Sequence, residues 1–244
     1  IMWFIIKRKL TRSIYLMEIT RPKGFLNGFT IKIIAMISML TDHTAAVFVN
    51  AGQHAYLYEF LRGAGRIAFP VFCFMLVEGF MHTGDVKKYL LRLFIFAVIS
   101  EIPFDLAFFA CPGTYFDHQN VFFTLALGLL TLCCIRQFEN DPYMNIVSIV
   151  IACIIAYLLK FDYSYFGILQ IMIFYYLRQS GLYKIFSIAV LNIIMGQPAG
   201  ALALIFTEAY NGRRGPDVKY AMYIFYPAHL LVIYFARTVI QGLL

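Results

Sequence analysis

Three ionisable residues interrupt an apolar segment near the start of the chain. Residues 31–49 form a run about long enough to cross a bilayer, yet the run contains Lys32, Asp42 and His43. Such a side chain costs roughly 3 kcal/mol at membrane depth, so it normally faces the protein interior or a water-filled cavity. Lys32 and His43 are eleven residues apart in the chain. They therefore share one helix face, roughly 16 Å apart along the axis. A neutral histidine beside a carboxylate suits a general base.

Further polar residues are expected to gather around this segment in two groups. Glu101 and Asp105 lie one helical turn apart, with Pro103 between them, at about the depth of His43. The group expected in the outer half of the membrane is Asp42, His43, Arg66, Glu101, Asp105, Asp117 and His118. The group expected on the inner side is Lys32, Glu78, His82, Lys87, Lys88, Arg92 and Arg213. An acid–base cluster facing out and a cationic rim facing in suit group transfer across a membrane.

Each of these residues also has a purely structural interpretation. Lys32 reads equally well as a side chain that extends to the interface, and His43 as a histidine satisfied inside the bundle. Glu101 and Asp105 fit ion pairs with arginines that hold helices together. His229, near the middle of the last apolar run, fits a structural hydrogen bond better than a functional role when taken alone.

The composition predicts a polytopic membrane protein built as one helical bundle. The chain has 244 residues, of which 61% are hydrophobic and only 14% are charged. We expect a basic cytoplasmic leader at 1–30, one transmembrane domain at 31–237 and a short tail at 238–244. The net charge of +7 does not indicate a nucleic-acid partner, because the cations cluster in particular loops. The spacing of the five cysteines and five histidines matches no metal motif, so no metal site is predicted.

The apolar runs predict about nine spans, within a range of eight to ten, each a helix across the lipid bilayer. They lie at 31–49, 66–81, 89–109, 120–135, 146–160, 165–177, 184–195, 199–210 and 220–237. Cations concentrate in alternate loops, which places the N-terminus in the cytoplasm and the C-terminus outside. Arg62 and Arg66, in the expected first outer loop, are the exception to this pattern.

Several strings together resemble the TraX family over about residues 24–235. They are KIIAMISMLTDH, GRIAFPVFCFMLVEGF, KKYLLRLFIFAVISEIPFDLAFF, HQNVFFTLALGLL, NGRRG and KYAMYIFYPAHLL. The resemblance implies a bacterial inner-membrane protein of the kind named for conjugative pilin acetylation. The chain is more distantly similar to the integral-membrane acyltransferases, which carry an arginine, ten residues and a catalytic histidine on their first helix. Lys32 and His43 repeat that spacing, with lysine in the place of arginine.

The resemblance implies acetyl transfer from cytoplasmic acetyl-CoA to an extracytoplasmic acceptor, either a pilin amino terminus or a surface glycan. In this interpretation His43 is the general base, and Asp42, Glu101 or Asp105 orients or tunes it. The candidates for substrate binding are Lys32, Arg66, Glu78, Asp117, His118 and His229. Two other classes of function stay open: a proton-coupled transporter or flippase, and a non-catalytic assembly factor for a surface filament.

Overall fold

The computed structural model describes residues 24–109, 118–217 and 219–242, and every regular element within them is helical. This confirms the all-α prediction. The helices are α2 (Gly28–Phe48), α3 (Ala55–Gly65), α4 (Ala68–His82), α5 (Val86–Phe108), α6 (Val121–Gln137), α7 (Pro142–Leu158), α8 (Ser164–Tyr176), α9 (Gly181–Ile194), the 3₁₀ helix η1 (Pro198–Leu202), α10 (Ala203–Glu208) and α11 (Lys219–Gly242). Apart from α3, they follow the predicted apolar runs. The first begins earlier than expected, at Gly28, and the last continues to Gly242.

Polar residues immediately before the helices fix where several of them begin. The first backbone amides of a helix have no partner inside it, and a side-chain oxygen at the preceding residue can accept from them. The residues that do so are Asn27 before α2, Asp85 before α5, Asn120 before α6 and Asp141 before α7. Each lies at the start of an expected apolar run or shortly before it, so the chain itself encodes these helix starts.

Three helical segments of the described residues are long and apolar enough to cross a membrane by length and composition. They are Gly28–Phe48, Ala55–His82 and Tyr220–Gly242. Other apolar helices are shorter, such as α8 with 13 residues and α9 with 14. A span needs about 17 residues or more, so these short helices cannot cross a bilayer of ordinary thickness without local thinning of the bilayer.

The expected first outer loop is instead a helix, and that part of the sequence prediction is wrong. Arg62 lies in α3 and Arg66 caps its end, and α3 continues almost directly into α4. The helix forms because it packs against α2: the Ser38 hydroxyl donates to the carbonyls of Ala64 and Gly65, at 2.7 and 3.0 Å. The two arginines therefore belong to a helix interface. The rule that cations mark cytoplasmic loops does not apply to them.

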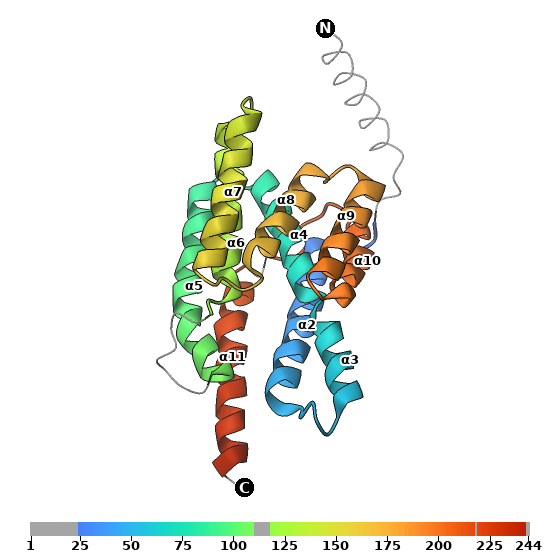
Figure 1. Ribbon diagram of the computed structural model, residues 1–244, viewed down its shortest axis with the longest axis vertical. Coiled ribbons are helices and arrows are strands. Elements are labelled where there is room, and N and C mark those ends of the chain that lie inside the picture. The colour runs from blue at the N-terminus through green and yellow to red at the C-terminus, as the bar shows by residue number, and fades with distance from the viewer. Residues whose placement is uncertain (1–23, 110–117, 218, 243–244) are drawn as a thin grey trace.

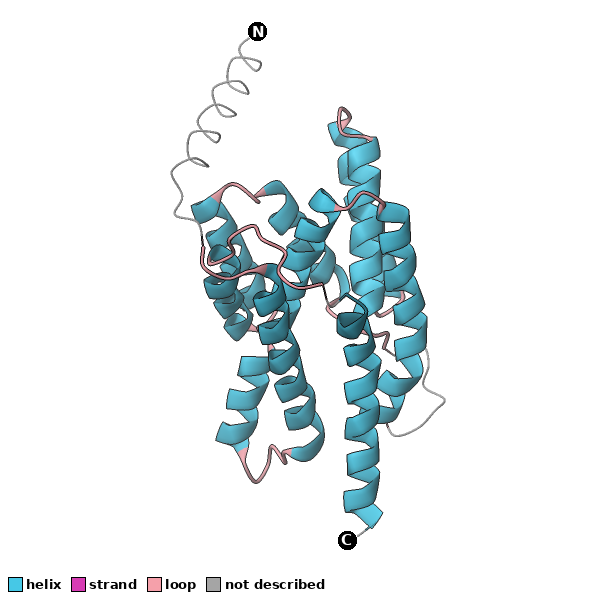
Figure 2. Cartoon of the chain, turned by 180° about the vertical axis from the view of Figure 1, so that it is seen from behind, coloured by secondary structure: helices cyan, strands magenta, loops and turns pink. Residues whose placement is uncertain are grey.

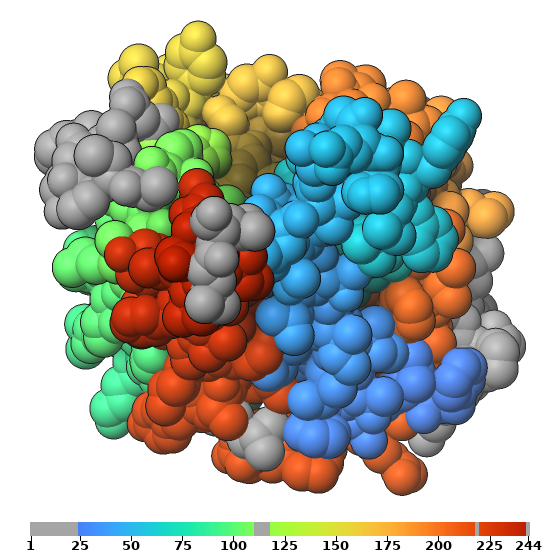
Figure 3. Space-filling view, turned by 90° about the horizontal axis from the view of Figure 1, so that it is seen from below, coloured from blue at the N-terminus to red at the C-terminus, as the bar shows by residue number. Residues whose placement is uncertain are grey.

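The arrangement of the bundle brings the first and last described helices together. Figures 1 and 2 show α2 and α11 running in the same direction, with the α2–α3 hairpin and the end of α11 extending at the end opposite the α6–α7 connection. Seen from that end, α11 and α2 lie side by side, with α3 on the far side of α2 (Figure 3). The helix α5 packs along α11 and α6, and α8 packs against α4, α6 and α7.

Small residues allow two of these close helix crossings. A Cβ on Gly65 would lie 2.2 Å from the Cβ of Asp42, so only glycine lets α3 approach α2 this closely. A Cβ on Gly128 would lie 2.3 Å from the end of Ile171, at the crossing of α6 and α8. Small residues at helix crossings are typical of membrane bundles, because packing there replaces the hydrophobic drive found in water.

Candidate functional site

Two histidines from distant parts of the sequence meet between α2 and α11. The Nδ1 atom of His43 lies 2.8 Å from the Nε2 atom of His229, a hydrogen-bonding distance. The ring planes differ by only 11°, so the N–H of one ring can point along the lone pair of the other. His229 is buried, with 5% of its surface exposed, and its Nδ1 atom lies 2.8 Å from the backbone oxygen of Phe225.

Aromatic rings enclose the histidine pair. Phe108 from α5 packs edge-on to His43 with ring centroids 5.1 Å apart, so α5 reaches the pair as well. Tyr226 packs edge-on to both histidines and also to Phe122, the second residue of α6. The pair therefore sits in a largely apolar surrounding, where a hydrogen bond between two polar groups is stronger than in water.

A cavity of about 480 Å³ lies next to the histidine pair. Its walls come from α2, α4, α5, α6, α11 and the connection before α11, and its lining includes Tyr226, Phe122 and Met39. Because Tyr226 also packs on both histidines, one end of the cavity is separated from the pair by a single aromatic ring. Its volume falls within the range typical of small-molecule sites.

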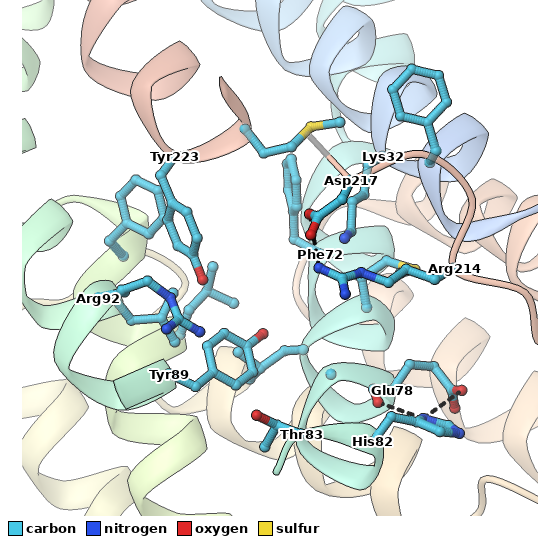
Figure 4. Close-up of a pocket in the computed structure, with 18 of the residues that line it drawn as sticks. Lys32, Phe72, Glu78, His82, Thr83, Tyr89, Arg92, Arg214, Asp217 and Tyr223 are labelled. Carbon is cyan, nitrogen blue, oxygen red and sulfur yellow. Dashed lines mark hydrogen bonds and ion pairs between the residues drawn. The ribbon is translucent and has the colours of Figure 1, made fainter. Parts of the chain in front are cut away.

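Cations and tyrosines from several helices surround the other part of the cavity. Figure 4 shows Lys32 and Arg214 facing Arg92 across the space, with Tyr89 and Tyr223 beside Arg92. Arg214 forms an ion pair with Asp217 at 2.8 Å, which offsets part of its charge. The sequence predicted Lys32 and Arg92 on one side of the membrane, and the structure places both on one cavity. An anionic ligand is favoured by this arrangement of charge.

Glu78 also lines this cavity, but its carboxylate is held by an arginine. Arg178 donates to Glu78 through Nε at 2.6 Å and through a terminal nitrogen at 3.1 Å, which is a bidentate pair. Glu78 is buried at 5% exposure. Lys184, which adjoins Arg178, forms a further ion pair with Glu208 at 2.6 Å. The carboxylate is therefore tied into the packing of α4 against the α8–α9 connection.

Asp42 faces α3 rather than His43. Its carboxylate lies 2.8 Å from Arg62 and 4.0 Å from Arg66. Consecutive residues of an α-helix point about 100° apart, so a neighbour in sequence is not a neighbour in space. Among the described residues, the hydrogen-bond partner of the His43 ring is His229, which takes the place expected for a carboxylate.

Glu101 holds the start of α6. Its carboxylate accepts from the side-chain amide of Asn120 at 2.5 Å and from the Asn120 backbone amide at 3.3 Å. The same side-chain amide donates to the Ala97 carbonyl, and the Asn120 oxygen caps the helix through Phe122. This network gives Glu101 a positional role at the crossing of α5 and α6.

Asp105 is buried at 1% exposure, and neither of its carboxylate oxygens is hydrogen-bonded to a described residue. Phe108, one turn further along α5, is the residue that contacts His43. Asp117, a predicted substrate-binding residue, lies outside the described residues.

His118 and Asp162 link the α5–α6 and α7–α8 connections. The Nε2 atom of His118 lies 3.5 Å from Asp162, and this interaction raises the pKa of His118 above its ordinary value of 6.5. Burial opposes the rise, while Glu101 adds to it and Lys160 opposes it. Because the pKa of His118 is higher in the folded than in the unfolded protein, its interaction with Asp162 stabilises the fold at pH values below the unfolded-state pKa. This stabilisation is lost as the pH rises through the folded-state pKa.

We expect Asp162→Asn to remove the pH-dependent part of this stabilisation. The variant should lose more thermal stability at pH 5.5 than at pH 8.5, because only the charged histidine gains from the carboxylate. Melting temperatures in detergent, measured at both pH values, test this. His118→Gln should give the same pH dependence as Asp162→Asn. An equal loss at both pH values would contradict the prediction.

Three of the residues at these sites were not singled out from the sequence. Tyr226, between the cavity and the histidines, carries no signal that separates it from the other 16 tyrosines. Arg62 could have been found, because a buried Asp42 needs a cation and Arg62 is one of the few nearby in the chain. Asn120 could have been found as a helix cap, since it is the polar first residue of an expected apolar run.

The described fold is that of a membrane protein, a bundle of apolar helices with a histidine pair and a cation-lined cavity inside. Residues 27–237 match the TraX family, described as "TraX protein", so the chain belongs to this family. It is 32% identical over 242 residues to the "Probable fimbrial assembly protein FimC, serogroup H1" of Dichelobacter nodosus. That alignment covers 88% of this chain and 97% of the relative. No solved structure matches the chain.

Proposed function

We propose that this protein is a membrane acyltransferase that moves an acetyl group from cytoplasmic acetyl-CoA to an acceptor outside the inner membrane. The proposal rests on the position of the His43–His229 pair, which lies behind the Tyr226 ring next to a cavity lined by Lys32, Arg92 and Arg214. The anionic part of the donor belongs with the cations, and the thioester belongs near His43. Lys32 and His43 are roughly 16 Å apart along α2, comparable to the reach of a pantetheine arm.

In this proposal His43 acts as a general base. It takes a proton from an amine or hydroxyl of the acceptor as the acceptor's lone pair forms a bond to the thioester carbonyl carbon. The carbon–sulfur bond then breaks, and the leaving thiolate of coenzyme A takes the proton from His43. Tyr226 has to move aside, because its ring lies between the cavity and the histidines.

The acceptor is proposed by class only, as a pilin amino terminus or a surface glycan. The basic loops predict that the Lys32 end faces the cytoplasm, so the acceptor would approach His43 from the opposite end, between α2 and α11. Among the polar residues described in that half of the bundle are Asp42, Arg62, Arg66, Glu101 and His118. Asp42 pairs with Arg62 and Arg66, His118 contacts Asp162, and Glu101 accepts from Asn120.

A filament-assembly role without catalysis is the second candidate, because the relative in Dichelobacter nodosus is named as a fimbrial assembly protein. A proton-coupled transporter is the third, since buried carboxylates and histidines also serve carriers. Calorimetric titration of the purified full chain in nanodiscs with acetyl-CoA separates the first candidate from the other two. Saturable binding with one site supports the acyltransferase. The absence of binding up to millimolar acetyl-CoA would overturn it.

We expect Lys32→Ala to weaken acetyl-CoA binding about tenfold or more, because it removes a phosphate-facing cation, while turnover at saturating donor changes little. Lys32→Arg should retain or tighten binding, since a guanidinium can grip a phosphate through two hydrogen bonds. The same calorimetric titration gives both affinities. Lys88→Ala is the matched control, because Lys88 is an exposed lysine outside the cavity, paired with Asp85. Equal affinities for the Lys32→Ala variant and the unmodified protein would place the donor elsewhere.

A further inference from the structure

We propose that His229 is a positioning residue that fixes the tautomer of His43, so that Nε2 of His43 is the nitrogen that accepts the proton. This inference rests on the proposed function, in which His43 is the general base. The carbonyl oxygen of Phe225, the ring of His229 and the ring of His43 form a continuous chain of hydrogen bonds, with heavy-atom distances of 2.8 Å at both links.

The direction of the chain follows from its first link. A carbonyl oxygen can only accept a hydrogen bond, so the Nδ1 atom of His229 carries the hydrogen. In a neutral imidazole the other nitrogen is then an acceptor, and Nε2 of His229 has a lone pair. The hydrogen in the second link must therefore come from Nδ1 of His43. This leaves Nε2 as the unprotonated nitrogen of a neutral His43.

If the hydrogen bond ran from His229 to His43, His229 would have to be positively charged in an apolar surrounding. If His43 accepted at Nδ1, His229 would have to carry hydrogens on both nitrogens and a positive charge. His229 is buried at 5% exposure and is packed against Phe225 and Tyr226. Burial of an unpaired charge among such rings is costly. Among the described residues no carboxylate contacts either ring, because Asp42 is paired with Arg62 on the other side of α2.

The free nitrogen of His43 remains available for chemistry. His43 is only partly buried, unlike His229, and no described residue hydrogen-bonds to its Nε2 atom. When Nε2 takes up a proton, the Nδ1 hydrogen strengthens its bond to His229 or moves onto it, and the Phe225 carbonyl stabilises the resulting charge. A histidine and a carbonyl thus do the orienting work that a carboxylate does in other catalytic sites, without adding a negative charge to the membrane interior.

The test uses two substitutions at position 229 in the full chain. Glutamine can place an amide oxygen near the position of the lost Nε2 atom, so His229→Gln retains an acceptor for His43. Leucine cannot accept, so His229→Leu frees the His43 tautomer. We expect His229→Leu to lower the transfer rate about 10- to 100-fold, by analogy with the loss found when a residue that orients a metal-bound histidine is replaced. His229→Gln should recover most of that loss, and both variants should bind acetyl-CoA normally. The exposed His54, replaced by glutamine, is the control.

Nitrogen NMR of the ¹⁵N-histidine-labelled protein in lipid gives a readout that does not depend on activity. In the unmodified protein the His43 signals, assigned by their loss in His43→Ala, should show a protonated Nδ1 and a bare Nε2. In His229→Leu they should shift toward the opposite tautomer. A bare Nδ1 on His43 in the unmodified protein would overturn the inference. So would full activity of His229→Leu. The expected tautomer in a protein that neither binds acetyl-CoA nor transfers acetyl groups would overturn the proposed function and leave the hydrogen-bond chain standing.

Discussion

Replacing His43 with alanine is expected to lower acetyl transfer by about 10²- to 10⁴-fold, the usual contribution of a general base. Acetyl-CoA binding should stay nearly unchanged, because the cations assigned to the donor lie at the other part of the cavity. The measurement is the release of coenzyme A thiol by the purified protein in nanodiscs, with isolated cell-envelope material as the acceptor. In cells, mass spectrometry of surface pili and glycans should show the corresponding loss of acetyl groups.

Two controls make this result specific. His54→Ala removes an exposed histidine at the start of α3 and should retain full transfer. Melting temperature reports whether His43→Ala is still folded, because the substitution also removes the hydrogen bond to His229. A folded His43→Ala protein with near-normal turnover would exclude His43 as the base. The proton acceptor would then have to be sought among the other polar residues of the bundle.

The second large effect concerns stability and the ion pair between Glu78 and Arg178. Arg178→Met leaves the Glu78 carboxylate buried without its bidentate partner. Breaking a buried pair in this way costs roughly 3–5 kcal/mol. Because 30% of the Arg178 side chain is exposed, water screens part of the interaction and the lower end, about 3 kcal/mol, is expected. Unfolding in mixed detergent and SDS, followed by circular dichroism, measures the loss.

Removing both charges should be less harmful than removing one. The double variant Glu78→Gln/Arg178→Met leaves no unpaired buried charge, so its stability should recover much of the loss. Lys88→Met breaks the exposed pair with Asp85 and should change stability little. If Arg178→Met is as stable as the unmodified protein, the pair does not hold α4 in place. Glu78 would then have to be considered again as a residue that binds substrate.

The apolar runs and the polar residues near their starts were enough to predict most of the helices and where many of them begin. Long apolar runs can satisfy their backbone in lipid only as helices, and residues such as Asn27, Asp85 and Asn120 can cap those helices without any help from the rest of the fold. The common face of Lys32 and His43 also follows from spacing alone, because helical periodicity is a local property.

The helix α3 (Ala55–Gly65) was missed because its charged residues resemble a loop in a membrane protein. Arg62 is acceptable there only because Asp42 on α2 neutralises it at 2.8 Å. A sequence can show that Asp42 needs a cation, but it does not show that a glycine at position 65 lets the two helices approach closely enough for the pair to form.

The partner of His43 was decided entirely by tertiary structure. The sequence favoured a carboxylate, either the adjacent Asp42 or one on the third expected span, because those are near in sequence or at a similar calculated depth. His229 lies 186 residues away and reaches His43 because α2 and α11 pack side by side. Spacing along one helix fixes only which way a side chain points. Which side chain it meets depends on how helices pack, and packing depends on contacts summed over the whole bundle.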